Sequence, residues 1–276
     1  MGEGQVWAAG MKRFVKAILP LPARIAIKRW GHGLHDLIDP IKDPRIPPRR
    51  ETFIGGGDFA LVGESFRETL LRHGLTPDMD VLDVGCGQGR MARPLIEVLQ
   101  GGSYTGFDID KSGIEWCRDK YTDVPHFTFD HADVFNARYN AGGAVVAKDY
   151  VFPYADNHFD RIFLTSVFTH MFADDVENYL SEIARVLKPG GKALITWFLW
   201  DDTPKSNPIM DFYAEVDAVS RTTLPENPEA ALAFGRDWVE ALYTKLGLEI
   251  ATIELGGWRE SVLDGSIQDL VVGVKG

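Results

Sequence analysis

The chain has 276 residues, of which 45% are hydrophobic and 25% are charged. This composition is that of a globular protein and excludes a disordered or fibrous chain. The formal net charge of −11 argues against a nucleic-acid partner, because phosphate binding needs a basic surface. Two cysteines, Cys86 and Cys117, are too few for a disulfide framework, and we predict a cytoplasmic protein.

Residues 1–50 form a basic, proline-punctuated arm ahead of an acidic remainder. They hold ten Lys or Arg and four Asp or Glu, so they carry +6, against −17 for residues 51–276. No apolar run in the arm approaches the ~20 residues that a membrane-spanning helix needs. We expect the arm to pack on its own domain or on a partner subunit of an oligomer. Peripheral contact with an anionic membrane is the alternative.

Residues 51–276 alternate helix and strand patterns, which predicts one α/β domain. The predicted helices cover 59–73, 90–99, 112–120, 174–187, about 208–219 and about 235–246. The predicted strands cover 81–84, 103–107, 127–130, 159–164, 192–199, 248–255 and 267–274. Strand–helix alternation implies a parallel sheet covered on both faces. The last two strands have no helix between them, so we expect an antiparallel hairpin at one edge.

A glycine-rich turn, Asp83-Val-Gly-Cys-Gly-Gln-Gly-Arg90, follows the first strand. Glycine has no side chain, so the backbone there can turn tightly and lie against a ligand. The following helix start adds free N–H groups and a partial positive charge. The spacing departs from the dinucleotide pattern G-x-G-x-x-G, because Arg90 occupies its last position. A carboxylate at Asp83 suits an ammonium-bearing ligand such as S-adenosylmethionine better than a pyrophosphate.

Two further carboxylates follow the second and third strands. Asp108 lies 19 residues beyond Gly89, where it can accept two hydrogen bonds from ribose hydroxyls. Capping of the next helix is the alternative role, which Asp110 or Ser112 could serve equally. Asp133 is placed to accept a hydrogen bond from an adenine amino group, with a turn or capping aspartate as the alternative.

Together these segments resemble class I S-adenosylmethionine-dependent methyltransferases. Residues 81–90 match the first motif of that family, residues 106–110 its acidic loop and residues 132–133 its adenine motif. Residues 152–160 resemble the lead-in to its fourth strand, and residues 179–191 match the helix and turn before its fifth strand. The resemblance covers about half of the chain, and the set of motifs is far more specific than the glycine turn alone.

The resemblance implies a Rossmann-like α/β fold with helices on both faces of a seven-stranded, mostly parallel sheet. The implied strand order is 3-2-1-4-5-7-6, with the last strand antiparallel. It also implies S-adenosylmethionine as the cofactor, with Asp83 and the glycine turn at its methionine end, Asp108 at the ribose and Asp133 at the adenine. The predicted cofactor-binding residues are Asp83, Gly85, Cys86, Gly87, Gly89, Arg90, Asp108, Ile109, Asp133, Val134 and Thr165.

The loop after the fourth strand should face the transferable methyl group, because ligands bind beyond the C-terminal ends of parallel strands. His170 in this loop is the candidate catalytic base, since an imidazole can accept a hydroxyl proton near neutral pH. A structural histidine bonded to the loop backbone is the alternative. Two inserts, residues 135–151 and 199–235, should lie near the acceptor. Asp201 and Asp202 are interpreted as an acidic loop that caps the next helix, with binding of a divalent metal ion as the alternative, and no metal site is predicted.

These features predict an enzyme that transfers a methyl group in line to a hydroxyl of a small molecule or saccharide. Methyl transfer to nitrogen or carbon of a small molecule is one alternative. A non-catalytic protein that binds the cofactor is another, because binding and transfer are separable. An NAD-type oxidoreductase is disfavoured by Arg90 and by the closing strand pair.

Overall fold

The computed structural model describes residues 42–48, 58–137, 139–201, 209–259 and 266–276. The chain divides into two units, residues 1–59 and residues 60–276. In the described part of the first unit, the Asp43 carboxylate accepts a hydrogen bond from the Arg45 N–H at 2.9 Å. Most of the predicted arm lies outside the described residues. Among the described helices, none combines the length and apolar character that crossing a membrane requires.

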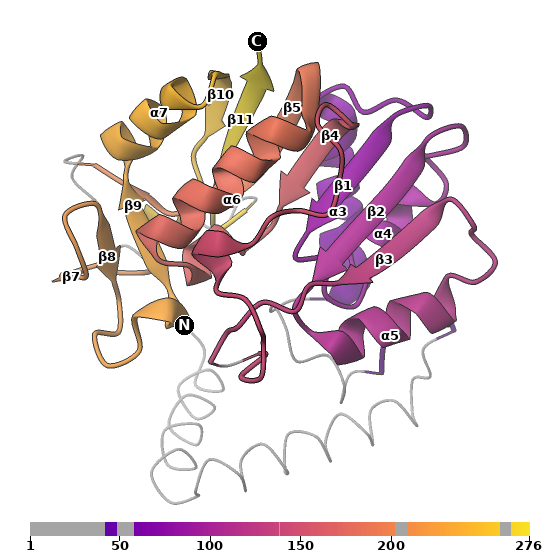
Figure 1. Cartoon of the computed structure of the whole chain (residues 1–276), viewed down its shortest axis with the longest axis horizontal. Coiled ribbons are helices and arrows are strands. Elements are labelled where there is room, and N and C mark those ends of the chain that lie inside the picture. The colour runs from indigo at the N-terminus through magenta and orange to yellow at the C-terminus, as the bar shows by residue number, and fades with distance from the viewer. Residues whose placement is uncertain (1–41, 49–57, 138, 202–208, 260–265) are drawn as a thin grey trace, which may run out of the picture. The chain divides into compact units, whose positions relative to one another are not determined.

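The second unit contains a seven-stranded sheet in the order β10-β11-β5-β4-β1-β2-β3 (Figure 1). The strands are β1 (Asp80–Val84), β2 (Ser103–Asp108), β3 (Phe127–His131), β4 (Phe159–Leu164), β5 (Leu187–Trp197), β10 (Leu248–Glu254) and β11 (Asp269–Lys275). The first five run parallel, and β11 is antiparallel to both of its neighbours. From β3 onward this is the order 3-2-1-4-5-7-6, so the predicted fold is confirmed.

Helices cover both faces of this sheet. They are α3 (Phe59–Arg72), α4 (Ala92–Leu95), α5 (Lys111–Lys120), α6 (Ala173–Val186) and α7 (Arg236–Lys245). Successive strand residues point to opposite faces, so Ile162 and Leu164 pack with α6 and α7, whereas Phe163 packs with α3, α4 and α5. Figure 1 shows α6 in front of the sheet and α3 behind it. The predicted two-faced covering is therefore present.

The helix predicted over residues 90–99 is much shorter in the structure, where only Ala92–Leu95 is α-helical. Pro94 has no N–H to donate to the carbonyl of Arg90 four residues earlier, which removes one helical hydrogen bond. Ile96 then bonds to the Arg93 carbonyl at 3.4 Å, in the tighter three-residue pattern. The spacing of apolar residues over 90–99 therefore predicts correctly that the segment is buried, but it overestimates the length of the helix.

The helix predicted over about 208–219 is wrong for the described residues 209–219. The segment after β5 instead contributes to a four-stranded sheet in the order β6-β9-β8-β7. Its strands are β6 (Leu199–Trp200), β7 (Ala214–Glu215), β8 (Ser220–Thr222) and β9 (Leu232–Gly235). The Asp217 carboxylate accepts hydrogen bonds from the N–H groups of Val219 and Ser220 at 2.9 and 2.7 Å. Such side-chain bonds stabilise a turn in competition with a helix.

Asp269, the first residue of β11, joins the small sheet to the central sheet. Its carboxylate is fully buried and accepts hydrogen bonds from the backbone N–H of Leu199 and of Gly256, both at 2.8 Å. The Trp258 indole N–H donates to it at 2.9 Å, and the Arg259 guanidinium pairs with it at 2.6 Å. These four donors compensate the buried negative charge of Asp269. The bond from Leu199 also attaches β6, the first strand after β5, to the start of β11.

Candidate active site

In the glycine turn after β1, all three glycines adopt a backbone conformation that residues with a side chain rarely adopt. Gly85, Gly87 and Gly89 have φ values of +80°, +53° and +74°, in the left-handed region that favours glycine. A Cβ on Gly85 would collide with a methyl group of Val167, whereas a Cβ on Gly87 would meet nothing within 4 Å. The turn thus leaves free space at the Gly87 backbone, which fits a ligand lying against it.

Hydrogen bonds attach this turn to the end of β2. The N–H groups of Gly85 and Cys86 both donate to the Phe107 carbonyl, at 2.8 and 3.1 Å. The Gly87 N–H donates to Asp108 Oδ2 at 2.7 Å. The shape of the turn is therefore set jointly by its own glycines and by the neighbouring strand.

Cys86 lies within the turn and Cys117 packs against it from α5, and both are buried. The Cys117 thiol donates to the Gly87 carbonyl at 3.6 Å, and Gly106 leaves space for Cys86, whose sulfur lies 2.9 Å from the position of a Cβ there. Burial raises the pKa of both thiols, so they stay protonated. These contacts are those of packing residues and not those of a nucleophile.

Asp83 is almost completely enclosed, with 1% of its surface exposed. The Tyr104 hydroxyl donates to its Oδ2 at 2.6 Å, and its Oδ1 has no hydrogen-bond partner. Burial raises the pKa of Asp83 to about 8, opposed by the bond from Tyr104. A deeply buried carboxyl group therefore stands at the start of the turn, at the position predicted for contact with the methionine end of the cofactor.

Asp108 ends β2 beside the turn. Its Oδ2 accepts the Gly87 N–H and its Oδ1 accepts the Asp110 N–H at 2.7 Å. Burial raises its pKa, and these two N–H donors oppose that effect. Each oxygen keeps a further lone pair, so the predicted ribose contact is compatible with the structure. The predicted alternative, capping of α5, belongs to Asp110, whose side chain accepts from Ser112 N–H.

The other predicted cofactor residues are distributed around the same sheet edge. Ile109 is half-buried against the core, and its carbonyl lies 3.2 Å from a ring nitrogen of His131. Val134 is buried, whereas the Asp133 side chain is exposed and lies 3.3 Å from the amide nitrogen of Asn140. Arg90 and Thr165 are half-buried. Their contacts with a cofactor stay predictions.

The loop after β4 passes directly over the glycine turn. Val167 packs against Gly85, as its methyl group would collide with a Cβ there. Ser166 adopts a left-handed φ of +59° although it is not glycine, and its N–H donates to Thr196 Oγ1 at 2.8 Å. Its hydroxyl bonds to Gln268 at 3.0 Å. Non-glycine residues hold such a conformation only where surrounding contacts impose it.

His170 lies in a short 3₁₀ turn of the same loop, and its Nδ1 is 2.7 Å from the Glu229 carbonyl oxygen. A carbonyl oxygen can only accept, so Nδ1 carries the hydrogen and the Nε2 of the neutral ring keeps its lone pair. His170 is thus hydrogen-bonded to backbone, as a structural histidine would be, but the partner is Glu229 and not the loop that carries His170. That same bond fixes the tautomer that a general base needs.

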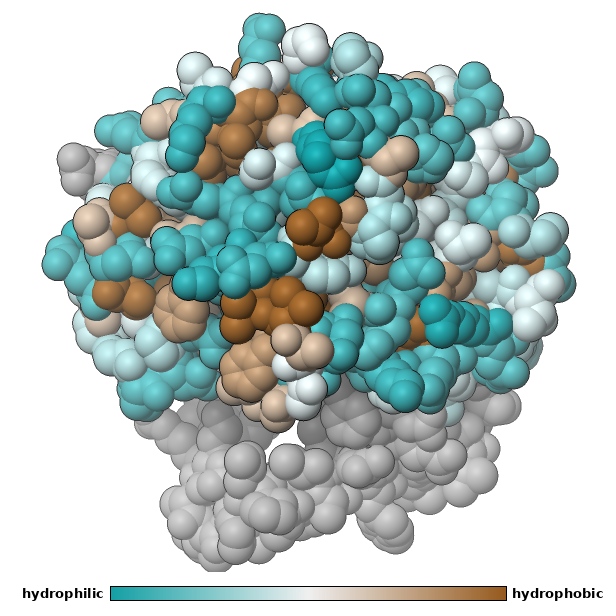
Figure 2. All heavy atoms as spheres, in the orientation of Figure 1, coloured by the Kyte–Doolittle hydropathy of each residue, from teal (hydrophilic) through white to brown (hydrophobic). Residues whose placement is uncertain are grey.

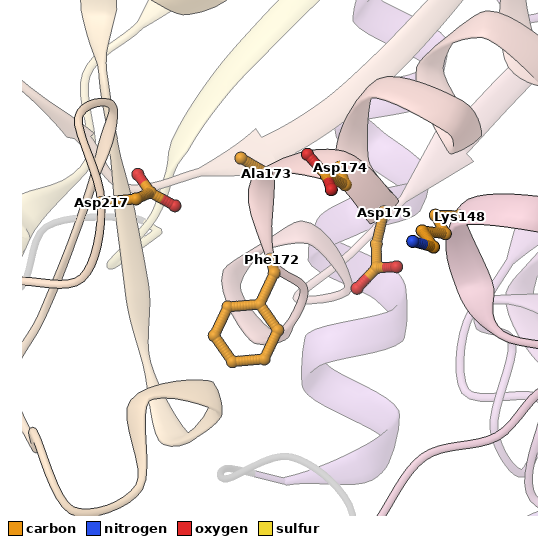
Figure 3. A pocket seen from close by; sticks show the side chains of 6 residues that line it. All are labelled: Lys148, Phe172, Ala173, Asp174, Asp175 and Asp217. Atoms are coloured by element: carbon orange, nitrogen blue, oxygen red, sulfur yellow. The ribbon is translucent and has the colours of Figure 1, made fainter.

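A cavity of about 300 Å³ opens next to this loop (Figure 3). Its lining residues are Lys148, Phe172, Ala173, Asp174, Asp175 and Asp217. Figure 3 shows Phe172 between Asp217 on one side and Asp175 on the other, with the Lys148 side chain pointing toward Asp175. Lys148 comes from the segment before β4 and Asp217 from the segment after β5. The described parts of the two inserts therefore converge at the loop that carries His170.

The carboxyl groups near this cavity influence one another. Burial raises the pKa of Asp175, while hydrogen bonds from the N–H groups of Phe172 and Lys148 lower it. Burial also raises the pKa of Glu229, with the charge of Asp175 adding to this effect and His170 opposing it. None of these acidic residues was predicted as a site residue. Asp174 and Asp175 appeared in the sequence only as the first residues of the helix predicted over 174–187, and nothing local marks Asp217.

Asp201 forms an ion pair with Arg259, at 3.8 Å between Oδ2 and Nη2, while Asp202 lies outside the described residues. Within the described parts of the chain, no three His, Cys, Asp or Glu side chains gather in a way that would hold a metal ion.

Residues 82–195 match the family model described as Methyltransferase domain. This range begins inside β1 and ends inside β5, so it contains the glycine turn, Asp108, Asp133 and the loop with His170. The chain contains a class I methyltransferase domain. The resemblance seen in the sequence is thereby confirmed, and the cofactor of this class is S-adenosylmethionine.

Curated relatives extend the comparison. The chain is 32% identical to the sterol 24-C-methyltransferase ERG6B of Gibberella zeae over 154 residues, which are 50% of this chain and 35% of that protein. It is 34% identical to the fatty-acid O-methyltransferase of Mycolicibacterium smegmatis over 116 residues, 42% of this chain and 36% of that protein. The chain thus spans little more than a third of the length of these relatives.

Among solved structures, the [4+2]-cyclase SpnF shares the fold, with a TM-score of 0.55 and 15% sequence identity. The alignment covers 90% of this chain and 96% of SpnF. That protein is named as a cyclase and not as a methyltransferase. The fold alone therefore does not decide the reaction, which must be argued from the site.

Proposed function

We propose that this methyltransferase domain transfers a methyl group from S-adenosylmethionine to a hydroxyl group of a small molecule, a saccharide being one such acceptor. The observation that carries the proposal is the loop after β4. At one end Val167 packs on Gly85 of the glycine turn, and at the other end Phe172 lines the cavity. His170 stands between them, with Nε2 able to accept a proton.

The donor side fits the proposed cofactor by the residues that surround the turn. A ligand can lie beside Gly87, because a Cβ there would meet no atom within 4 Å, and Asp108 retains lone pairs for ribose hydroxyls. The unpartnered oxygen of Asp83 supplies a carboxyl group where a cationic end would be favoured. When bound, S-adenosylmethionine supplies a methyl group that its positively charged sulfur has already activated.

The protein then has to position the acceptor against the methyl group and to accept one proton from the acceptor hydroxyl. The acceptor oxygen forms a bond to the methyl carbon as the methyl–sulfur bond breaks, which leaves neutral S-adenosylhomocysteine. His170 Nε2 takes the hydroxyl proton as the new bond forms, and the Glu229 carbonyl holds the ring through Nδ1. Alignment of the two reactants can contribute ~7–11 kcal/mol to the barrier reduction.

The cavity lining favours a hydroxyl-bearing acceptor. Asp174, Asp175 and Asp217 offer carboxylate oxygens that accept hydrogen bonds from hydroxyl groups, and Phe172 offers a flat apolar surface.

One observation favours a second candidate, an acceptor with an aliphatic part. The segments flanking β4 expose the large apolar residues Phe135, Val145, Val146, Val151 and Phe172. Figure 2 shows apolar patches that interrupt the polar surface on the side of the molecule where α6 lies in front.

The proposal is tested by incubating the full chain with methyl-labelled S-adenosylmethionine and a panel of saccharides, phenols, hydroxylated fatty acids and sterols. We expect label in a methyl ether of at least one hydroxylic acceptor, whereas label in a methyl ester would indicate transfer to a carboxyl oxygen instead. His170→Ala should lower turnover at least ~10²-fold, while affinity for S-adenosylhomocysteine changes no more than a few-fold. His158→Ala, a histidine just before β4, is the matched control and should leave turnover unchanged.

Label found on carbon or nitrogen would contradict the hydroxyl acceptor while preserving methyl transfer. Cofactor binding without transfer to any acceptor would favour a binding protein. Absence of binding to S-adenosylmethionine and S-adenosylhomocysteine would contradict the whole proposal. An unchanged rate for His170→Ala would remove His170 from the mechanism.

A further inference from the structure

Asp83 and Tyr104 form a pair whose hydrogen bonding is incomplete. The Tyr104 hydroxyl donates to Asp83 Oδ2 at 2.6 Å, and both residues are almost completely buried. Asp83 Oδ1 is buried too and has no partner. Buried polar atoms in folded proteins are nearly always hydrogen-bonded, so an orphaned carboxyl oxygen at a ligand turn calls for a proton or a ligand to complete it.

The groups that face Asp83 offer no positive charge to compensate an ionised carboxylate. Tyr104 on β2, Cys86 in the turn and Cys117 on α5 all have raised pKa values and stay neutral. Asp108, at the end of β2, adds negative charge. Among the described residues, no Lys, Arg or His forms an ion pair with Asp83.

The described lysine and arginine side chains on α3, α4 and α5 form ion pairs with acidic residues other than Asp83. Arg67 on α3 pairs with Glu64 at 3.2 Å, and Arg93 on α4 pairs with the same glutamate at 3.0 Å. An ionised Asp83 would therefore be both desolvated and unpaired in the ligand-free chain. Burial accordingly raises the pKa of Asp83 to about 8. At neutral pH the Asp83 side chain is therefore protonated in most of the protein molecules.

We propose that Tyr104 is a positioning residue that holds Asp83 for the ammonium end of the cofactor, and that Asp83 releases its proton as this cation binds. The inference rests on the proposed function and deepens it by coupling cofactor affinity to pH. The Asp83 O–H bond breaks, its electron pair stays on the carboxylate, and the proton passes to the buffer. The cation need not touch the buried oxygen, because charges attract over several ångströms where water is excluded.

The direction of the pH effect follows from proton release. Lowering the pH restores the protonated form and opposes binding, so affinity should rise with pH until the carboxyl group is already ionised in the free chain. With a midpoint near 8, the dissociation constant should fall by about ten- to 30-fold between pH 6.5 and pH 8.5. Near pH 7, close to one proton should be released for each ligand bound.

The experiment is calorimetric titration of the full chain with S-adenosylhomocysteine, at several pH values and in buffers of different ionisation enthalpy. Asp83→Asn should release no proton from this site and should lose the pH dependence. Methylthioadenosine, which lacks the ammonium group, should bind wild-type chain without proton release. This ligand control separates the ammonium from the adenosine part.

Tyr104→Phe provides a second variant that keeps the ring and removes only the hydroxyl. Loss of the donor makes ionisation of Asp83 harder, so the midpoint of the affinity profile should move to higher pH. A merely structural tyrosine would weaken binding by the same factor at every pH, and that result would overturn the role of Tyr104.

Proton release that persists in Asp83→Asn would overturn the role of Asp83. Binding of S-adenosylhomocysteine with neither proton release nor pH dependence would overturn this inference and leave the proposed function standing. Failure of S-adenosylhomocysteine to bind at any pH would overturn both.

Discussion

The proposed donor side and the proposed acceptor side of this domain are built in different ways. The glycine turn takes its shape from three left-handed glycines and from bonds to the strand beside it. The cavity on the acceptor side draws Lys148, Phe172 and Asp217 from three separate segments. A site built from one short motif can be recognised in the sequence, whereas a site assembled from distant segments cannot.

The largest effect is expected from removing Asp269, whose hydrogen bonds hold the small sheet to the central sheet. Asp269→Ala removes a buried carboxylate and takes from Arg259 its closest charged partner, so the free energy of unfolding should fall by about 3–5 kcal/mol. Denaturant unfolding measures this loss. In chain that is still folded, methyl transfer should fall more than affinity for S-adenosylhomocysteine.

Asp119→Ala is the control for this anchor, because Asp119 pairs with Lys120 and its side chain is 72% exposed. That variant should change the free energy of unfolding by less than about 0.5 kcal/mol. Equal losses in the two variants would mean that Asp269 does not anchor the small sheet.

The next effect concerns stability and pH on the donor side. The pKa of Asp83 is raised to about 8 in the folded chain, against an ordinary value near 4 in the unfolded chain. The folded state binds the proton more tightly, so stability is fully present at low pH and is lost as pH rises from 4 to 8. Without cofactor, wild type should lose up to about 4 kcal/mol more than Asp83→Asn between pH 5 and pH 8. Parallel profiles in denaturant titrations would contradict this.

Gly85→Ala tests the backbone of the turn itself. A left-handed φ of +80° and a collision with Val167 should together lower the free energy of unfolding by about 2–4 kcal/mol. Cofactor affinity should fall with it, because the loop over the turn must move. Gly142→Ala is the control, since a Cβ there meets nothing within 4 Å and no left-handed φ is needed. Similar stability of the two variants would refute the steric argument.

The smallest effect tests a single hydrogen bond that supports the turn from α5. The Tyr121 hydroxyl donates to the Gly89 carbonyl at 3.2 Å. Tyr121→Phe should lower the free energy of unfolding by about 1 kcal/mol, with a modest loss of cofactor affinity. Tyr213→Phe is the comparison, because Tyr213 is 64% exposed and its loss of a hydroxyl should have no measurable effect.

Most of the fold could be predicted because its signals are local. The strand predicted over 159–164 has those bounds in the structure, and the helix predicted over 174–187 differs by one residue at each end. The helix over 90–99 failed at Pro94, whose missing N–H a purely apolar pattern ignores. The helix over 208–219 failed because Asp217 bonds to the backbone ahead of it and starts a turn.

The sequence by itself determined the alternation of strands and helices, the glycine turn and the carboxylates at the ends of β1, β2 and β3, while the sheet order was implied by the resemblance to a known family. The features read from the residues depend on side-chain period, on glycine's freedom at positive φ and on motif spacing, all of which lie within short stretches of chain. Only the tertiary structure decided the hydrogen bond that fixes the His170 tautomer, the partner of Asp83 and the lining of the cavity. Each of these joins residues far apart in sequence, and their proximity results from packing the whole domain.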